Sequence, residues 1–204
     1  MHPHLTRRFV LLAAMPALAG CSAVSALNAA AEPIDTFDLA PVAGSRTGRR
    51  TSRTLLVATP EAPAAIASDR ILIRPTPAAI TYLPDARWSD DLTRVVQSLL
   101  IRSISGTTRI GYVGQADGGP VPDTALLVRI DAFEARVRPD TSIEITIDIA
   151  LTLLDDRDQR VVATRSFVRT TRAADDSAAA IVAAFQSVLD VILPVMADWV
   201  VAAA

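Results

Sequence analysis

Between residues 142 and 154 the sequence alternates apolar and polar side chains at nearly every position. The apolar members of this segment are Ile143, Ile145, Ile147, Ile149, Leu151 and Leu153. A period of two places them all on one face of a strand, and that face must be covered to leave water. A polar turn at residues 155–159 follows, and residues 160–171 return as the antiparallel partner. The chain is therefore predicted to contain a long hairpin with one buried face.

The clearest helix is expected at residues 89–105, where apolar side chains recur every three or four positions. Ser89 is expected to cap this helix, with Asp90 and Asp91 in its first turn, where negative charge suits the helix dipole. Gly106 is expected to end it. Asp90 and Asp91 could instead be a catalytic carboxylate pair, but their position favours the role in starting the helix.

A second helix is expected at residues 176–201, which present a broad apolar face. The polar residues Gln186, Asp190 and Asp198 interrupt the apolar sequence and argue against a membrane span. Pro194 is expected to kink this helix or to end its regular part.

The rest of the chain is expected to supply shorter strands. Pro75 and Pro77 are expected to mark a turn between two of them, because proline is excluded from central strand positions. The predicted fold is α+β, with a mainly antiparallel sheet and the two principal helices packed on one face. The further strands are expected at residues 36–42, 54–59, 70–74, 79–83, 109–113 and 125–137.

A basic loop is expected at residues 43–53, between the first two of these strands. It carries Arg46, Arg49, Arg50 and Arg53. These side chains could contact anionic lipid head groups, but a solvated surface loop is the simpler interpretation.

The N-terminus has the order of features that a secretory signal requires. Arg7 and Arg8 precede an apolar run that begins at Phe9, and small residues lead to the only cysteine of the chain, Cys21. The sequence Leu-Ala-Gly-Cys at residues 18–21 resembles a bacterial lipobox. In such signals the Gly20–Cys21 bond is cut, the thiol carries a diacylglycerol, and the new amino terminus receives an acyl chain such as palmitate.

This resemblance predicts a signal peptide at residues 1–20, a lipidated flexible tether at 21–35 and one folded domain at 36–204. More than one acyl chain is needed for stable anchoring to a bilayer. Two alternatives are a buried cysteine in a soluble domain and an ordinary secretory signal cut near Ala26 or Ala30. The apolar run is too short for a membrane span, which needs about 20 residues.

The composition limits the chemistry. Both histidines, His2 and His4, precede the expected cleavage site, so the mature chain would contain none. Catalytic triads and metal sites that need histidine are then excluded, and we expect no metal, no cofactor and no enzymatic activity. A hydrolase that uses two carboxylates stays open as an alternative. The net charge of −2 argues against nucleic acid as a partner.

Several segments, taken in order, resemble one protein family. The chain is similar to the ABC-type transport auxiliary lipoproteins, the PqiC-like partners of mammalian-cell-entry (MCE) transporters. No single motif is specific, and the resemblance rests on order and spacing. The segments are 37–39, 70–74, Tyr82 with Leu83, Ala86 to Trp88, 165–167 and 176–185.

The resemblance implies a non-catalytic component of a system that moves lipids or other hydrophobic molecules across the bacterial envelope. Its expected partners are the periplasmic MCE-domain protein and, through it, an inner-membrane permease and ATPase. Ser22 after the cysteine resembles the outer-membrane sorting pattern. An envelope scaffold unrelated to lipid transport is the alternative function.

Tyr82 and Trp88 are the residues closest to a family signature. They are expected to pack the first helix onto the sheet, and an exposed partner-binding role is the alternative. The partner is expected to dock on a sheet edge or loop surface, because the apolar helix faces should be buried. A homo-oligomer is also compatible with the sequence.

Overall fold

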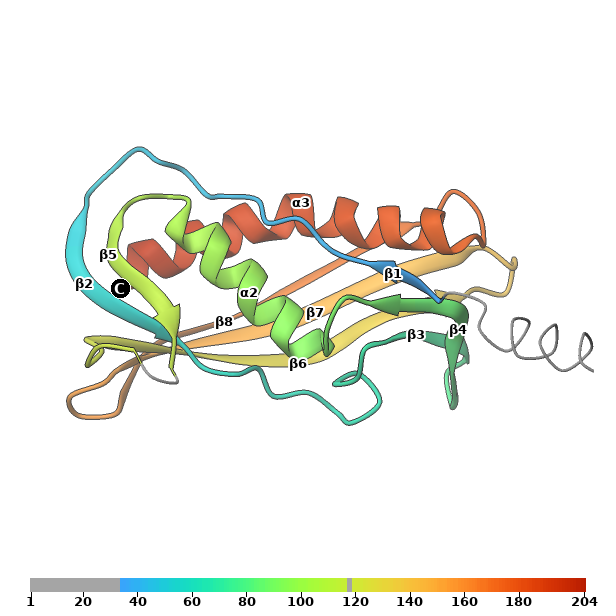
Figure 1. Ribbon diagram of the computed structural model, residues 1–204, viewed down its shortest axis with the longest axis horizontal. Coiled ribbons are helices and arrows are strands. Elements are labelled where there is room, and N and C mark those ends of the chain that lie inside the picture. Colours follow the sequence, from blue (N-terminus) through green and yellow to red (C-terminus); the bar gives the residue numbers. More distant parts are fainter. Residues whose placement is uncertain (1–33, 117–118) are drawn as a thin grey trace, which may run out of the picture. The chain divides into compact units, whose positions relative to one another are not determined.

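The three longest strands of the computed structural model, which describes residues 34–116 and 119–204, form an antiparallel meander (Figure 1). These strands are β6 (Thr124–Val137), β7 (Ile143–Asp155) and β8 (Arg160–Arg172). Ile149 in the central strand lies opposite Ile130 of β6 and Phe167 of β8. The predicted long hairpin is therefore confirmed, and a third long strand extends it.

The other strands make the sheet mixed, which corrects the prediction of a mainly antiparallel sheet. Strands β2 (Thr51–Val57) and β3 (Arg70–Thr76) both run parallel to β6, along the edge that β7 does not occupy. β5 (Ile110–Gln115) is parallel to β2. The long connection from β2 to β5 includes β3 and helix α2 (Leu92–Ser105), and a crossover of this kind returns the chain in its original direction.

The remaining two strands complete the far side of the sheet. β4 (Ala79–Trp88) forms an antiparallel hairpin with β3, and the short β1 (Asp35–Phe37) lies parallel to β4. Pro77 lies in the hairpin turn as predicted, whereas Pro75 belongs to the end of β3. Pro75 is tolerated there because it follows Ile73 and Arg74, which are the residues that pair with β6.

Helix α2 (Leu92–Ser105) begins three residues later than predicted. Asp91 is its N-cap and makes no capping hydrogen bond through its side chain. The hydroxyl of Ser89 instead donates to Asp38 Oδ1 at 3.1 Å, which ties the segment before α2 to the N-terminal segment. Asp90 and Asp91 therefore do not form the first turn, while Gly106 follows the last turn as expected.

Helix α3 (Ala178–Ala203) is capped by Ser177, whose hydroxyl accepts a hydrogen bond from the Ala180 N–H. It starts two residues after the predicted start and continues beyond Pro194, which therefore does not end it. Its length and mean hydropathy of 2.0 would suit a membrane span, but half of its most apolar 18-residue window is buried within the domain. This burial is typical of the core helix of a globular domain.

Both helices pack on the same face of the sheet, as predicted (Figure 1). The alternating residues Ile145, Ile147 and Ile149 of β7 are at most 1% exposed and share one apolar core with the two helices. Complete burial of such a side chain contributes about 1.5–3 kcal/mol. The apolar face of β7 that the sequence predicted thus forms one side of the core.

Candidate functional site

Trp88, one of the two signature residues, ends β4 and is 2% exposed. Its ring meets Phe133 of β6 and Phe185 of α3 edge-on, at centroid distances of 5.9 and 5.3 Å. Phe133 and Phe185 stack on each other at 4.8 Å. These ring contacts join the sheet to α3, whereas the expectation named the first helix, and Trp88 offers no surface to a partner in this arrangement.

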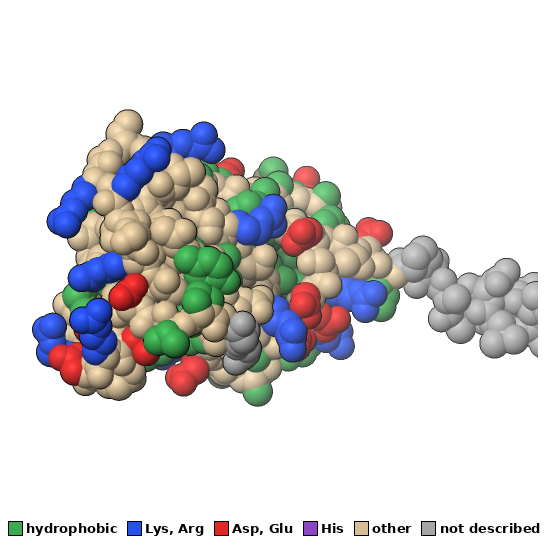
Figure 2. Space-filling model, turned by 60° about the vertical axis from the view of Figure 1, so that its left-hand side comes forward, with side chains coloured by type: hydrophobic (Ala, Val, Ile, Leu, Met, Phe, Trp, Pro, Cys, Tyr) green, Lys and Arg blue, Asp and Glu red, His purple; other side chains and the backbone are tan. Residues whose placement is uncertain are grey.

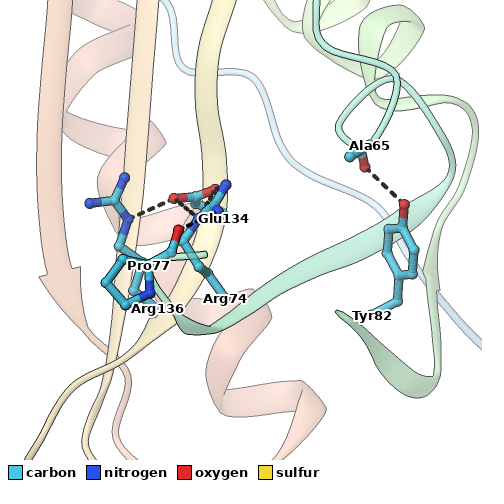
Figure 3. Close-up of polar contacts among 6 residues, drawn as sticks. All are labelled: Ala65, Arg74, Pro77, Tyr82, Glu134 and Arg136. Atoms are coloured by element: carbon cyan, nitrogen blue, oxygen red, sulfur yellow. Dashed lines mark hydrogen bonds and ion pairs between the residues drawn. The ribbon is translucent and has the colours of Figure 1, made fainter. Parts of the chain in front are cut away.

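Tyr82, the other signature residue, lies half-buried on the same strand. Its hydroxyl donates to the Ala65 carbonyl at 3.4 Å (Figure 3). The Arg70 guanidinium lies 4.7 Å from the ring centroid, within the range of a cation–π contact. Tyr82 thus ties the β3–β4 hairpin to the loop before it, and Arg70 shields one side of its ring.

Glu134 forms the most deeply buried ionic group among the described residues. It lies on β6, on the sheet face that carries no helix, and its side chain is 2% exposed. The Arg74 guanidinium from β3 donates to both carboxylate oxygens, at 2.9–3.1 Å (Figure 3). Arg136 donates from the other side at 2.6 Å, and Arg74 also donates to the Pro77 carbonyl at 3.2 Å.

The two arginines decide the charge state of this carboxylate. Burial alone would raise the pKa of Glu134, but the hydrogen bonds from Arg74 and Arg136 outweigh it and lower the pKa below its ordinary value. Glu134 is therefore ionised near neutral pH and has no proton to give. The geometry suits a structural clamp between β3 and β6 rather than general acid–base chemistry.

A second acidic group lies on the same face of the sheet, which carries no helix and is called the open face below. Asp131 accepts two hydrogen bonds from Arg129, at 2.9 and 3.0 Å, and these lower its pKa. Burial and repulsion by Asp131 raise the pKa of Asp148 on β7, and Arg129 opposes this rise. Neither carboxylate lines either of two hollows found in the described part of the surface.

These hollows are shallow, with volumes of about 180 and 230 Å³. The smaller lies between the N-terminal segment and α2, beside Asp38, Ser89 and Arg94. The larger lies between β8 and α3, beside Phe167 and Val191. Both are below the usual size of pockets that enclose a small organic ligand, about 300–1,000 Å³.

The basic segment at residues 46–53 is ordered by contacts with the ends of both helices. Arg46 donates to the Gly106 carbonyl at 3.1 Å, and Arg53 donates to the carbonyl of Ala204. Arg49 and Arg50 are exposed, and they form no ion pair within residues 34–116 and 119–204. Figure 2 shows arginine side chains, in blue, around the outline of one end of the molecule. Arg53 lies in β2 rather than in the predicted loop.

Residues Gly20 and Cys21, at the expected processing site, lie outside the described residues, so lipidation stays a prediction. Within the described residues, no three side chains of His, Cys, Asp or Glu gather as metal ligands. Sequence reasoning missed the Glu134 clamp. The alternation of Phe133, Glu134 and Ala135 could have placed Glu134 on the face opposite the core, but nothing local pointed to Arg74, sixty residues earlier.

Comparison with known proteins gives one family and solved structures of similar fold. The sequence model of the family described as "ABC-type transport auxiliary lipoprotein component" matches residues 36–197. The crystal structure of protein XCC0632 from Xanthomonas campestris superposes with a TM-score of 0.75 at 27% identity, over 82% of this chain and 95% of that one.

A second crystal structure, of an uncharacterized protein, is similar in fold. Its TM-score is 0.65 at 15% identity, over 83% of this chain and 99% of that one. No curated protein matches the chain.

Proposed function

The chain belongs to the family of ABC-type transport auxiliary lipoprotein components, and we propose that it serves an MCE-type transport system. In this proposal the protein is a non-catalytic, membrane-anchored component. It docks the periplasmic MCE-domain protein at the outer membrane, so that lipids or other hydrophobic molecules cross the envelope. The observation that carries the proposal is the family match over residues 36–197.

The shape of the domain supports a docking role over a role in enclosing cargo. The apolar faces of α2 and α3 are occupied by the core, and both described hollows are small and open. A partner would therefore meet exposed strand edges and loops. Tyr112 on β5, which is 45% exposed, marks one such edge.

The partner can be tested by crosslinking in intact cells. A photoreactive phenylalanine analogue would replace Tyr112, with wild-type protein as the control for background. We expect the captured material to contain an MCE-domain protein. Capture of other envelope proteins alone, or the absence of any MCE gene from the genome, would favour the envelope scaffold instead.

The anchor can be tested separately. Intact mass measurement of membrane-extracted protein should show loss of residues 1–20 and a gain of acyl chains on Cys21. Cys21→Ser should leave the chain unprocessed. A soluble mature protein with an unmodified thiol would overturn the lipidation proposal.

The proposed outer-membrane location rests on Ser22. Density-gradient separation of the two membranes should recover the protein with the outer membrane. Ser22→Asp should move it to the inner membrane without affecting acylation. Recovery of the wild-type protein with the inner membrane would contradict this location.

A further inference from the structure

Two of the terminal strands of the sheet, β1 and β8, differ in charge and are both available for pairing. The sheet branches at β6, where β2 and β3 pair along one edge and β7 along the other, so β1, β5 and β8 are all terminal strands. β1 and β8 end the path β1-β4-β3-β6-β7-β8. Among the described residues, β8 pairs only with β7, and β1 pairs only with β4. Each strand therefore has one side with no strand partner in the described chain, and such edges are sites where another chain can add.

The edge at β8 is basic and apolar. Arg165 and Arg169 lie on either side of Phe167, and neither forms an ion pair within the described chain. Beside them lies the hollow of about 230 Å³ between β8 and α3, whose described lining contains no acidic residue. Five large aliphatic side chains around this edge are at least 40% exposed: Val161, Val162, Val168, Val191 and Val195.

The edge at β1 carries one acidic residue with apolar neighbours, and Arg87 of β4 donates to the Thr36 hydroxyl there. Asp35 is exposed and forms no ion pair within residues 34–116 and 119–204. Phe37, two residues later, packs against the core, and Ile34 beside it is 51% exposed. The β1 edge thus offers a negative charge at Asp35, whereas the β8 edge offers the positive charges of Arg165 and Arg169.

Strand directions allow these edges to meet. β1 is parallel to β4, β4 is antiparallel to β3, and β3 is parallel to β6. β8 has the same direction as β6, since both are antiparallel to β7. β1 therefore runs opposite to β8, and a second copy that continues the sheet would pair its β1 antiparallel with the first copy's β8.

The side-chain pattern selects one register. Phe37 and Phe167 both lie on the helix-covered face, because they pair with the core residues Trp88 and Ile149. Placing Phe37 opposite Phe167 puts Asp35 opposite Arg169 on that same face. Thr36 then lies opposite Val168 on the open face. A one-residue shift would turn the two aromatic rings to opposite faces.

We propose that β1 of one copy pairs antiparallel with β8 of a second copy, with Asp35 opposite Arg169 and Phe37 opposite Phe167. The two edges differ, so the contact is head-to-tail, and each copy has one free edge for a further copy. This self-association does not depend on which transport system the protein serves.

Disulfide trapping in the full-length chain tests the register directly. Directly opposed residues in antiparallel strands have Cα atoms about 4.5–5.5 Å apart, which suits a disulfide. Thr36→Cys combined with Val168→Cys should give a ladder of linked copies on non-reducing gels of oxidised membranes. Wild type and each single variant are the controls, and they also reveal any crosslink through Cys21.

A matched pair checks the register. Thr36→Cys with Thr164→Cys keeps both thiols exposed on the open face but four residues out of register, and it should give no ladder. Absence of the ladder in the Thr36/Val168 pair would overturn the proposal. Crosslinking of Val168→Cys alone, when Thr36→Cys alone and wild type give none through Cys21, would also overturn it, because that result means β8 pairs with β8.

Charge reversal tests the recognition. Asp35→Arg in the Thr36/Val168 cysteine background should reduce crosslinking about fivefold, because like charges then lie opposite each other. Adding Arg169→Asp should restore it. Restoration excludes misfolding as the cause of the loss, whereas unchanged crosslinking in the single reversal, or no recovery in the double one, would contradict the assigned pair.

Discussion

Phe133 and Glu134 are neighbours on β6, and they are 1% and 2% exposed on opposite faces of the sheet. Phe133 lies under α3 in the aromatic cluster with Trp88 and Phe185. Glu134 lies on the open face, covered only by Arg74 and Arg136. Two adjacent residues thus reach the same burial, one through apolar packing and the other through ion pairing.

The difference shows that the two faces of the sheet are stabilised by different interactions. Apolar packing is stabilising in proportion to the buried area and depends on little beyond shape. A buried carboxylate is costly unless its partners stay in place, so an ion cluster stabilises only as a complete unit. The covered face should therefore respond to lost volume, and the open face should respond to lost charge and to pH.

The largest expected effect is on the covered face. Phe133→Ala removes the ring that contacts both Trp88 and Phe185, and it should lower the free energy of unfolding by about 3–5 kcal/mol. Leu127→Ala on the same strand is the matched control, because Leu127 is 43% exposed. Its effect should stay within about 0.5 kcal/mol. Urea unfolding followed by circular dichroism measures both, and equal losses would show that the two faces do not differ as described.

The next effect is on Glu134. Glu134→Gln leaves two arginines without their anion and should cost about 1–3 kcal/mol at neutral pH. The pKa of Glu134 is lower in the folded state than in the unfolded state. The stability that the charged Glu134 contributes to the fold is therefore complete above the unfolded-state pKa, and it is lost as the pH falls through the folded-state pKa. The difference between wild type and variant should therefore shrink in acid. A difference that is constant with pH would show that the carboxylate charge is not the cause.

Removing the arginines one at a time should separate the two arms of the clamp. Arg74 contributes three of the hydrogen bonds to Glu134 and links β3 to β6, whereas Arg136 contributes one from the same strand. Arg74→Ala should therefore cost more than Arg136→Ala, by about 1 kcal/mol. Equal losses in urea unfolding would mean that β3 is held to β6 by its backbone pairing alone.

The same two faces explain what the sequence could predict. The alternation at residues 143–153 is a local pattern, and it correctly located the buried face of β7 and the side on which both helices pack. The parallel pairing of β2 and β3 with β6 depends on crossovers between distant segments. No local period reports such pairing, and the sheet was wrongly expected to be mainly antiparallel.

The candidate site shows the same limit. Trp88 and Tyr82 stood out because each is an aromatic residue in a recognisable order of segments. Glu134 has its main partner sixty residues away at Arg74, so its role appears only once β3 lies beside β6. The start of α2 was also missed by three residues, because Ser89 bonds to the distant Asp38 instead of capping the helix.

The smallest expected effect has the opposite sign. Asp148 lies on the open face with its pKa raised by burial and by repulsion from Asp131, so its charged form destabilises the folded state. A carboxyl with a raised folded-state pKa binds its proton more tightly in the folded chain, and stability should rise as pH falls through that value. Asp148→Asn should therefore raise the melting temperature at neutral pH, and this gain should disappear in acid. Thermal unfolding at several pH values measures the gain, with Glu134→Gln as the comparison that moves the other way. A loss of stability at neutral pH in Asp148→Asn would mean that Arg129 holds Asp148 more strongly than burial and Asp131 oppose it.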